Sequence, residues 1–521
     1  MLRHSGRLVL GLILLLALLH GSLYAVFLPP WGLIDEQQHF HYVQHLVEER
    51  SIPVVGQTYL SPEIIESLFA TRRWEVFHWS PPGSSDPEEM GLQVHSYEGY
   101  QPPFFYLLLA PLYAVLPGGV LTKLYALRLA AVCLSLLTIW IAFRTASDLF
   151  PRAPWLPYGV ALMLALLPER VMAVSRVNND VLLEVVAAAF IWVWTGAMWQ
   201  GLSGRNARLM GVLFGLGVLT KASMAVLGVV LLALFWFQRR ESDLWKYGLW
   251  TSSISGLIIV PWVVRNFVVY GDGMGFGGFR ALNETFRVVA SPPVTWRNLV
   301  SAGVDLFRHF WVVWWKGGSA GANPVVSILL VGVGLLSGLV VFNLLRLLKE
   351  PGAYGVEERE RCVLGTYLLA VGAYAAAVLV SYFTGKIPII QGRFFLPVVV
   401  PAVLLVGRGL ELQRRGKHLF AGFLVFLLGL DTLSLFGNLL PYHYYWSAFV
   451  GEGALQDPAA LSSCEAWRLF IQRLLRDKPP QIQRLMVWVF LFYLVVLPFA
   501  GLAFWRVNRR MVGSEPHGSL R

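Results

Sequence analysis

Two adjacent carboxylates, Asp35 and Glu36, directly follow the first long apolar run of the chain. His39 comes four residues after Asp35, and on a helix this spacing places both side chains on one face. A carboxylate at a membrane boundary is costly to hold there and is a functional candidate, because it can take a proton from an attacking hydroxyl. The alternative is that both carboxylates simply begin an interfacial helix, where negative charge suits the N-terminal dipole. The stretch alone does not separate these interpretations.

Fixed cations in later segments extend the chemistry that these carboxylates could perform. Lys and Arg neutralise a phosphate leaving group, and Arg often does so through two parallel hydrogen bonds. Charge placed where it develops in the transition state is usually the largest catalytic contribution. Carboxylates and cations on one membrane face would fit a reaction with an anionic lipid. The set that the predicted topology gathers on one face is Asp35, Glu36, His39, Arg176, Asn179, Asp180, Lys221, Arg265, Asp272 and Arg393.

The composition indicates a membrane protein. Of the 521 residues, 56% are hydrophobic, only 14% are charged and 20 are Trp, which is typical of a polytopic chain. The net charge of +11 does not indicate nucleic-acid binding, because the basic residues cluster in short loops between apolar runs. The three cysteines imply no disulfide framework.

The apolar runs predict an all-α, polytopic transmembrane fold with about 12 crossings. Outer segments carrying short juxtamembrane helices would connect them. The expected runs are Leu8–Leu28, Leu124–Ala146, Trp155–Met172, Val181–Trp199, Leu209–Phe237 as a hairpin, Tyr247–Val264, Val325–Leu348, Val363–Phe383, Phe395–Gly409, Leu419–Phe436 and Met486–Trp505.

The basic residues orient this topology. Arg3 and Arg7 precede the first run and Arg506 follows the last, so both termini are expected in the cytoplasm. The polar segments 29–123 and 437–484 then lie on the extracytoplasmic side of the plasma membrane. The chemistry predicted above would therefore take place outside the cytoplasm.

Two apolar stretches do not fit a single crossing. Phe104–Leu116 is shorter than the roughly 20 residues that a crossing needs, so it is expected to lie in the outer interface; an ordinary short span is the alternative. Leu209–Phe237 has Lys221 near its middle, and a reversal at Thr220–Ser223 keeps every later basic loop on the cytoplasmic side. This hairpin would place Lys221 near the outer face.

Several of these residues also have ordinary structural interpretations. Arg128 could be a snorkelling residue at a helix end. Asp180 could cap the helix that follows it, together with Asn178 or Asn179. Lys221 is costly in a short hairpin without a partner, which favours a functional role.

The histidines and a tryptophan cluster are similarly ambiguous. His39, His41 and His45 could suggest a metal site, but without a second Glu-x-x-His pair hydrogen-bonding roles are favoured. The cluster of Trp311, Trp314 and Trp315 favours an interfacial belt over sugar stacking.

The order of motifs along the chain resembles the GT-C superfamily of polytopic glycosyltransferases, which use polyprenyl-phosphate-linked sugars. The likeness is to a mannosyltransferase-like bacterial branch of mostly unassigned substrate, and it extends to about Pro401. It implies a catalytic module over 1–401, while 402–521 adds transmembrane helices without a motif. The matching stretches are Asp35-Glu36, Gln101-Pro102-Pro103-Phe104-Phe105-Tyr106, Arg128, Ser175 to Asp180, Gly217 to Lys221, Arg265-Asn266, Tyr270-Gly271-Asp272 and Gln391 to Pro397.

This resemblance implies roles for individual residues. Asp35 matches the first-loop acidic residue, which is the general base proposed for such enzymes, and Glu36 is its neighbour and potential substitute. Arg393, Lys221 and Arg176 would contact the donor phosphate. The expected donor or acceptor site comprises His39, Asp180, Asn179, Tyr106, Gln391 and Arg265.

The resemblance also implies a reaction. A hexose or pentose would pass from the lipid phosphate to a glycan, lipid or protein acceptor, with inversion by a single displacement. Some members need a divalent cation such as Mg²⁺ or Mn²⁺ and others do not; this sequence lacks a dense carboxylate cluster and leaves that need open. The alternatives are a transporter or flippase of lipid-linked substrates, which commonly has inverted repeats, or a scaffold with a decayed site.

Overall fold

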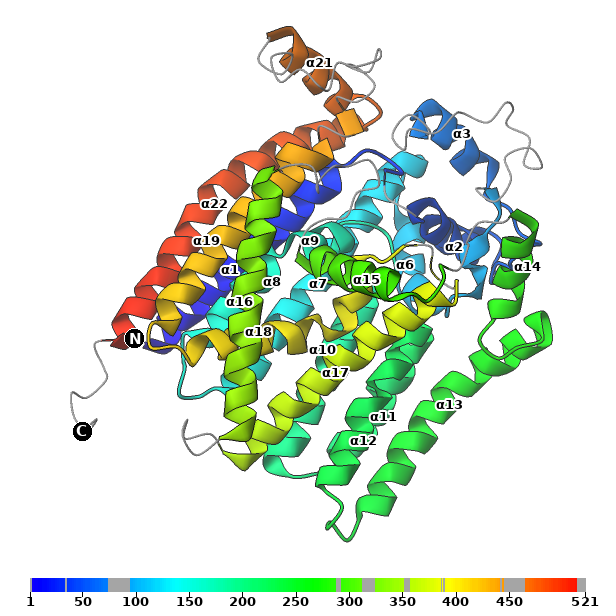
Figure 1. The fold of residues 1–521 in the computed structure, drawn as a ribbon. Helices are drawn as coiled ribbons and strands as arrows, with labels where there is room; N and C mark the ends of the chain where they lie inside the picture. The colour runs from blue at the N-terminus through cyan, green and yellow to red at the C-terminus, as the bar shows by residue number, and fades with distance from the viewer. Residues whose placement is uncertain are drawn as a thin grey trace.

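The computed structural model describes residues 2–32, 35–73, 94–286, 292–311, 324–350, 357–385, 387, 389–440, 443–444 and 464–512. These residues are nearly all helical, and the only β pairing among them is an isolated bridge between Tyr59 and His95. The predicted all-α fold is confirmed (Figure 1).

Nine helical segments in the described part of the chain are long and apolar enough to cross a membrane. They identify a multi-pass membrane protein, although the predicted count of twelve is not confirmed. The nine are α1 (Leu2–Phe27), α7 (Val120–Leu149), α10 (Asp180–Gln200), α13 (Leu244–Tyr270), α16 (Pro324–Lys349), α17 (Glu358–Phe383), η6 with α18 (Gly392–Val398 and Val399–Glu411), α19 (Gly416–Ser434) and α22 (Pro480–Val512).

The run predicted as one continuous span over Trp155–Met172 is broken. It forms α8 (Leu156–Leu166) and α9 (Pro168–Val174), which are bent by 64° to each other. Proline disfavours helical geometry in the residue before it, and Leu167 accordingly takes an extended conformation. The bend turns α9 across the end of the bundle.

The predicted hairpin around Lys221 is present. α11 (Gly204–Thr220) leads to Lys221, and then η3 (Ala222–Leu227) and α12 (Gly228–Phe237) run back. The Lys221 Nζ atom lies 2.6 Å from Asp180 Oδ1, so the chain has returned to the end of the bundle where α10 begins. Both arms fall outside the nine candidate spans, as does the broken α8–α9 run, and these three runs account for the difference from the predicted count of twelve.

Glycines let the hairpin pack closely on its neighbour. A Cβ atom on Gly211 would lie 2.8 Å from the Thr251 carbonyl oxygen of α13, and one on Gly215 would lie 3.0 Å from Ile258. Small residues spaced four apart are the usual means of close helix approach in membranes. They help to hold the Lys221 turn in place.

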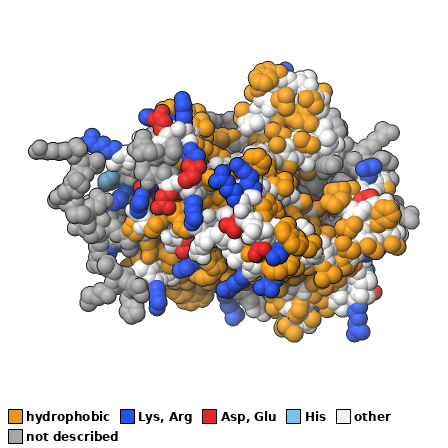
Figure 2. Space-filling view, turned by 90° about the horizontal axis from the view of Figure 1, so that it is seen from below, with side chains coloured by type: hydrophobic (Ala, Val, Ile, Leu, Met, Phe, Trp, Pro, Cys, Tyr) orange, Lys and Arg blue, Asp and Glu red, His pale blue; other side chains and the backbone are white. Residues whose placement is uncertain are grey.

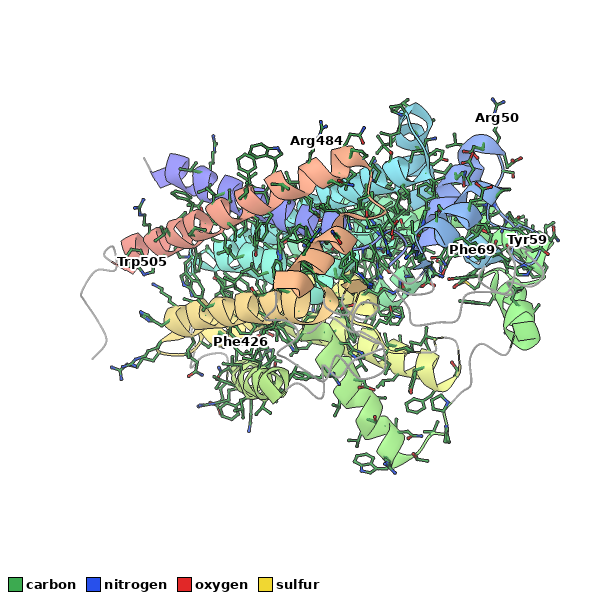
Figure 3. All side chains as sticks on the ribbon, turned by 90° about the horizontal axis from the view of Figure 1, so that it is seen from above. Arg50, Tyr59, Phe69, Phe426, Arg484 and Trp505 are labelled. Carbon is green, nitrogen blue, oxygen red and sulfur yellow. The ribbon has the colours of Figure 1, made fainter. Side chains whose placement is uncertain are left out.

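The described part of residues 29–123, which the sequence predicts on the outer side and which is called the first outer segment, has a hydrophobic core of its own. It contains α2 (Glu36–Glu48), α3 (Pro62–Ala70), η2 (Tyr97–Tyr100) and α6 (Phe104–Val115). Side chains from α2, α3 and α6 pack with the outer ends of α7 and α10 in one cluster. Seen from above, Arg50, Tyr59 and Phe69 of this segment lie on one side of the molecule, and Trp505 of α22 lies on the other (Figure 3).

α6 has the shape expected of an interfacial helix. It is 12 residues long, which is too short for a crossing of about 20 residues. Phe105 and Tyr106 are fully buried against the protein, whereas Leu107 and Leu108 are about half exposed. An apolar face left open in this way fits contact with lipid.

The opposite end of the bundle carries the short basic loops. Arg152 lies 3.9 Å from Glu357, and Arg359 donates a hydrogen bond to the Trp199 carbonyl, so the ends of α7, α10 and α17 meet there. Seen from below, Lys and Arg side chains are interspersed with Asp and Glu over this face (Figure 2).

The remaining helices complete the two ends. α14 (Phe276–Phe286), α15 (Trp296–Trp311) and α21 (Cys464–Leu475) lie outside the candidate spans. α22 runs along α1, and Asp431 of α19 is bonded to both His20 and Tyr24 of α1 at 2.8 Å. The C-terminal helices thus pack directly on the first span. The division between a catalytic module over 1–401 and further helices over 402–521 remains a prediction about function.

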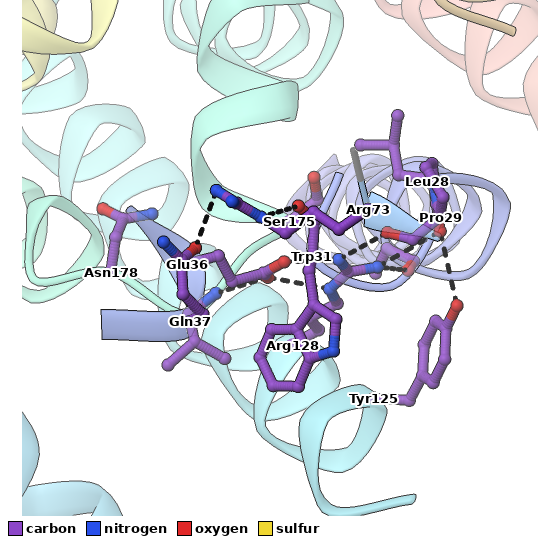
Figure 4. Close-up of polar contacts among 12 residues, drawn as sticks. Leu28, Pro29, Trp31, Glu36, Gln37, Arg73, Tyr125, Arg128, Ser175 and Asn178 are labelled. Carbon is purple, nitrogen blue, oxygen red and sulfur yellow. Dashed lines mark hydrogen bonds and ion pairs between the residues drawn. The ribbon is translucent and has the colours of Figure 1, made fainter. Parts of the chain in front are cut away.

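A buried ion pair fixes the corner between α1 and α2. Arg128 of α7 donates to both oxygens of Glu36, at 2.8 and 2.5 Å, and both side chains are fully buried. Arg128 also donates to the carbonyls of Ala25, Leu28 and Pro29 at the end of α1 (Figure 4). One guanidinium therefore bonds a carbonyl in the last turn of α1, two carbonyls just after its end, and the first residue of α2.

Replacing Arg128 by Met should destabilise the protein by about 3–5 kcal/mol, because it leaves the Glu36 carboxylate buried without a cation. Thermal unfolding in detergent measures this loss. The double variant Glu36→Leu and Arg128→Met should regain part of the stability, since no buried charge remains. Arg144→Met, on an exposed site of the same helix, should change stability by less than about 0.5 kcal/mol. A single variant as stable as the wild type would contradict this account.

Candidate active site

The centre of the candidate site is a contact between Asp35 and Arg393, residues that are 358 positions apart in the chain. Asp35 Oδ2 lies 2.8 Å from Arg393 Nη2, and Asp35 Oδ1 accepts a hydrogen bond of 2.7 Å from the Tyr97 hydroxyl. Asp35 occupies the N-cap position of α2, yet its side chain makes no capping hydrogen bond. Asp35 and Glu36 thus begin α2, as the helix-opening interpretation predicted, but the hydrogen bonds of the Asp35 carboxylate go to Arg393 and Tyr97.

The backbone at Asp35 is strained in a way that serves this contact. Its φ is 67°, in the left-handed region that non-glycine residues adopt rarely. Such strain persists only where the surrounding structure imposes it, and it is concentrated at functional sites. Here it directs the side chain towards η6 instead of towards the first turn of α2.

The charge state of Asp35 follows from its partners. Burial alone would raise its pKa, but the Arg393 guanidinium and the Tyr97 hydroxyl outweigh burial and hold the pKa below its usual value. Asp35 is therefore an ionised carboxylate at neutral pH while it stays paired with Arg393.

The position of Arg393 depends on the glycine that precedes it. A Cβ atom on Gly392 would collide with the His309 carbonyl oxygen and with the side chain of Glu169. This close approach lets the Arg393 backbone N–H donate to Glu169 Oε1 at 3.1 Å. The Arg393 Nε atom is buried and has no hydrogen-bond partner among the described residues. Part of the guanidinium is thus available to another acceptor.

A second carboxylate–cation pair is formed by Asp180 and Lys221. The contact between Lys221 Nζ and Asp180 Oδ1 is 2.6 Å, and Asp180 Oδ2 is buried without a partner in the described structure. Asn179 occupies the N-cap position of α10, and Asn178 Oδ1 accepts the Asp180 backbone N–H at 2.8 Å, so the capping interpretation holds for Asn178. The Asp180 carboxylate is instead paired with Lys221, and this pairing offsets the cost of the Lys221 charge in the hairpin.

Asn179 ties the second pair to the first outer segment. Its Nδ2 donates to Gln101 Oε1 at 3.1 Å and to the Thr220 carbonyl at 3.3 Å. It therefore connects the start of α10 with both the Gln101-Pro102-Pro103 stretch and the turn before Lys221.

Arg176 presents open hydrogen-bond donors inside the protein. The side chain is buried, and neither Nε nor Nη2 has a partner among the described residues. Burial, followed by the nearby Arg393 charge, lowers its pKa to about 10, so the group is still a cation at neutral pH. A buried guanidinium with free N–H groups is suited to an anion.

His39 shows that both pairs belong to one site. Its Nδ1 lies 2.8 Å from the Tyr106 hydroxyl, and burial lowers its pKa to about 3, so the imidazole is neutral. The charges of Asp35, Lys221, Arg393 and Asp180 all act on this ring. Groups from the first outer segment, the α11–α12 hairpin and η6 therefore converge around His39.

Two members of this cluster were not singled out from the sequence, Tyr97 and Glu98 of η2. Tyr97 donates to Asp35. Burial, together with the charge of Asp35, raises the pKa of Glu98 to about 7. Their position just before Gln101-Pro102-Pro103 was the only available signal, because the sequence does not reveal that η2 folds against Asp35.

Other predicted site residues have structural partners. Glu36 is enclosed by Arg128 and by the Val177 backbone N–H, so it has no free oxygen for proton transfer. Arg265 donates to Asn266 and to the Pro53 carbonyl, which joins α13 to the first outer segment.

The remaining predictions are resolved in the same way. Gln391 is buried at the start of η6, next to the segment that carries Arg393. Asp272 accepts the backbone N–H groups of Met274 and Phe276 and so forms a turn.

Arg128 is fully buried and does not snorkel. Trp311 packs against Phe423 inside the protein, so the belt interpretation was wrong for it; Trp314 and Trp315 lie outside the described residues.

The described residues do not fit a divalent-cation site. No group of three or more His, Cys, Asp or Glu side chains comes together among them. Asp35 and Asp180 each face a cation. His41 is hydrogen-bonded to Ser96 and His45 to Ser51, as the hydrogen-bonding interpretation predicted.

Comparison with known proteins supports the predicted resemblance. Residues 100–264 match the model of the dolichyl-phosphate-mannose-protein mannosyltransferase family. The matched segment contains Arg176, Asp180 and Lys221, and it ends before Arg265. The expected likeness to GT-C glycosyltransferases is thereby confirmed over this segment.

Solved structures with a similar arrangement of helices include two of ArnT from Cupriavidus metallidurans. The one bound to undecaprenyl phosphate is 15% identical, has a TM-score of 0.46, and the match covers 95% of this chain and 74% of that one. The apo state is 17% identical, with a TM-score of 0.40 and coverage of 89% and 76%. The apo oligosaccharyltransferase of Archaeoglobus fulgidus is 11% identical, with a TM-score of 0.43 and coverage of 89% and 60%.

The buried histidines of α2 predict a loss of stability in acid. Burial lowers the pKa of His41 to about 3, below the value of about 6.5 in an unfolded chain. Its contribution to stability is therefore fully present above about pH 6.5 and is lost as the pH falls towards 3; by about pH 5 the loss amounts to about 2 kcal/mol. His41→Gln should reduce the stability difference between about pH 7.5 and about pH 5 by this amount, measured by thermal unfolding.

The control for this measurement is His418→Gln, because His418 is exposed at the start of α19. It should leave the pH dependence unchanged. Identical pH profiles for His41→Gln and the wild type would show that His41 takes up its proton without cost to the fold.

Proposed function

We propose that this protein is a membrane glycosyltransferase that moves a hexose or pentose from a polyprenyl-phosphate donor to a hydroxyl group of a glycan, lipid or protein. The observation that carries the proposal is the contact of Asp35 with Arg393, beside Lys221 and the open donors of Arg176. A proton acceptor and three cations near one another are the groups needed to move a sugar off a phosphate. The family match over residues 100–264 supports the same class of reaction.

The site belongs on the extracytoplasmic side of the plasma membrane. The short basic loops lie at the end of the bundle opposite Asp35, and such loops favour the cytoplasm. Both termini then lie in the cytoplasm. The donor lipid would reach the site from the outer leaflet, where α6 exposes an apolar face.

The donor phosphate has to compete for two of its cations. In the structure without substrate, Arg393 is held by Asp35 and Lys221 by Asp180, while Arg176 has free N–H groups. The phosphate would bind Arg176 first and then draw Arg393 and Lys221 away from their carboxylates. Arginine is suited to this because its planar fork matches phosphate oxygens.

This exchange would activate the base. Once Arg393 turns to the phosphate, Asp35 stays buried but loses the cation that holds its pKa down, so its pKa rises. A base is most effective when its pKa approaches the ambient pH. Donor binding would thus convert Asp35 from an ion-pair partner into a proton acceptor.

An inverting displacement also requires Asp35 and Arg393 to move apart. The attacking oxygen and the leaving phosphate must lie on opposite faces of the sugar, so the sugar has to enter between Asp35 and Arg393, which are now 2.8 Å apart. Asp35 then takes the proton of the acceptor hydroxyl, and the oxygen forms a bond to the anomeric carbon. The carbon–oxygen bond to the phosphate breaks, and its electron pair leaves with the polyprenyl phosphate, held by Arg393, Lys221 and Arg176.

The alternative class is a transporter of lipid-linked substrates. Such proteins bind substrate near the bilayer midplane between repeated halves. Asp35, Lys221 and Arg393 instead gather at one end of the bundle, beyond the first helix and at the turn of a hairpin. This placement favours group transfer at the membrane surface.

Asp35→Asn should reduce sugar transfer by about 10²–10⁴-fold, because the amide cannot accept the proton of the acceptor hydroxyl. Transfer is measured in membranes supplied with radiolabelled polyprenyl-phosphate sugars. Glu49→Gln, an exposed carboxylate of the same outer segment, is the control and should retain activity. Undiminished transfer by Asp35→Asn would remove Asp35 from the mechanism.

The same variant should bind polyprenyl phosphate more tightly than the wild type. Without the Asp35 charge, Arg393 is free for the phosphate, and one hydrogen bond between charged groups corresponds to about tenfold in affinity. Binding of undecaprenyl phosphate to protein in nanodiscs measures the effect, with Glu49→Gln again as the control. Equal or weaker binding by Asp35→Asn would exclude competition between Asp35 and the phosphate.

A further inference from the structure

Glu98 is a second carboxyl group in the site to which the displacement assigns no task. It lies in η2, between Tyr97, which donates to Asp35, and Gln101, which accepts a hydrogen bond from Asn179. The charges of Asp35, Lys221 and Arg393 all act on it. It is therefore positioned among the groups that would surround the substrate.

The hydrogen bonding of Glu98 is incomplete. The residue is 8% exposed, and its Oε2 atom is buried without a hydrogen-bond partner among the described residues. A buried carboxyl oxygen without a partner is costly, and such groups in native proteins call for an explanation. Neither Lys221 nor Arg393 bonds this oxygen, since Lys221 is bonded to Asp180 and Arg393 to Asp35.

We propose that Glu98 binds a hydroxyl group of the transferred sugar and thereby positions the anomeric carbon between Asp35 and the phosphate. This role rests on the proposed glycosyl transfer. It makes Glu98 a determinant of which sugar is accepted.

The chemistry of the group favours a hydroxyl over the other parts of the donor. The phosphate is anionic and would be repelled by a carboxylate, and the lipid chain offers no hydrogen bond. A sugar hydroxyl both donates and accepts hydrogen bonds, and a carboxyl group does both across its two protonation states. Burial, followed by the Asp35 charge, raises the pKa of Glu98 to about 7, so both states are present near neutral pH.

Aromatic rings complete the environment of a sugar. Tyr100 is adjacent in η2, and its hydroxyl accepts a hydrogen bond of 3.1 Å from Gln101. Tyr106 is stacked against Tyr42 and bonded to His39. Polar groups set among aromatic surfaces are typical of sites that orient a small ligand.

Asp35 and Glu98 differ in pKa, and this difference suits the two carboxyl groups to different tasks. Asp35 is ionised and can accept a proton once Arg393 has left, whereas Glu98 holds a proton for part of the time. Paired titratable groups whose environments push their pKa values apart usually divide acid and base roles in this way. Glu98 would thus hold the sugar while Asp35 acts on the acceptor.

The test compares two ligands, undecaprenyl phosphate and the same lipid phosphate carrying mannose, glucose, galactose or arabinose. Wild type, Glu98→Ala and Glu98→Gln are each measured in nanodiscs, and Glu49→Ala is the matched control. The wild type should bind one sugar-lipid more tightly than the bare lipid. Glu98→Ala should reduce that preference by about tenfold or more without changing the affinity for the bare lipid, because only a hydrogen bond to the sugar is lost.

Glu98→Gln keeps the shape and one acceptor oxygen of the side chain, so it should retain part of the preference and should fold even if Glu98→Ala does not. An unchanged preference in either variant, an equal loss for both lipids, or a wild type that prefers no sugar-lipid would overturn the role of Glu98. So would a loss of turnover in Glu98→Gln with the preference intact, which would make Glu98 a base. Failure of the wild type to bind the bare lipid would instead contradict the proposed function itself.

Discussion

The ionic contact between Asp35 and Arg393 is the constraint on which the site depends. It joins the turn after the first span to the start of η6 at 2.8 Å. Opposite charges held out of water need close geometry to offset their desolvation, so every element around them must be placed accurately. Gly392 permits the approach of η6 to Glu169, and the left-handed backbone at Asp35 turns its carboxylate towards that helix.

The two adjacent carboxylates at the start of α2 have opposite tasks because their surroundings differ. Glu36 points into the bundle and is closed off by Arg128, which also satisfies the last carbonyls of α1. Asp35 is directed towards Tyr97 and Arg393. Glu36 anchors the corner, and this anchoring allows Asp35 to hold a strained conformation beside Arg393.

The architecture combines a packed scaffold with charged side chains whose ionic partners can change. The outer segment has its own apolar core on α7 and α10, and the α11–α12 hairpin is packed through glycines on α13. Asp35, Asp180 and Lys221 are carried by these supports and Arg393 by η6, and each has an unpaired atom or an ionic partner that the proposed phosphate would replace. Under the proposed function, these supports hold the cations in place before the phosphate binds.

The sequence by itself determined the fold class, the apolar helices and the reversal at Lys221, because apolar length and the placement of basic loops depend on local composition, and it made Asp35 a candidate. It could not determine which of two neighbouring carboxylates is sealed in the bundle, nor that Trp311 is buried, since both depend on helices distant in the chain. It also did not reveal the 64° bend at Leu167, because the run over Trp155–Met172 was predicted as one continuous span. Glu98 and Tyr97 entered the site only through the fold of η2 against Asp35, because a pKa and an ion pair are properties of neighbours in space.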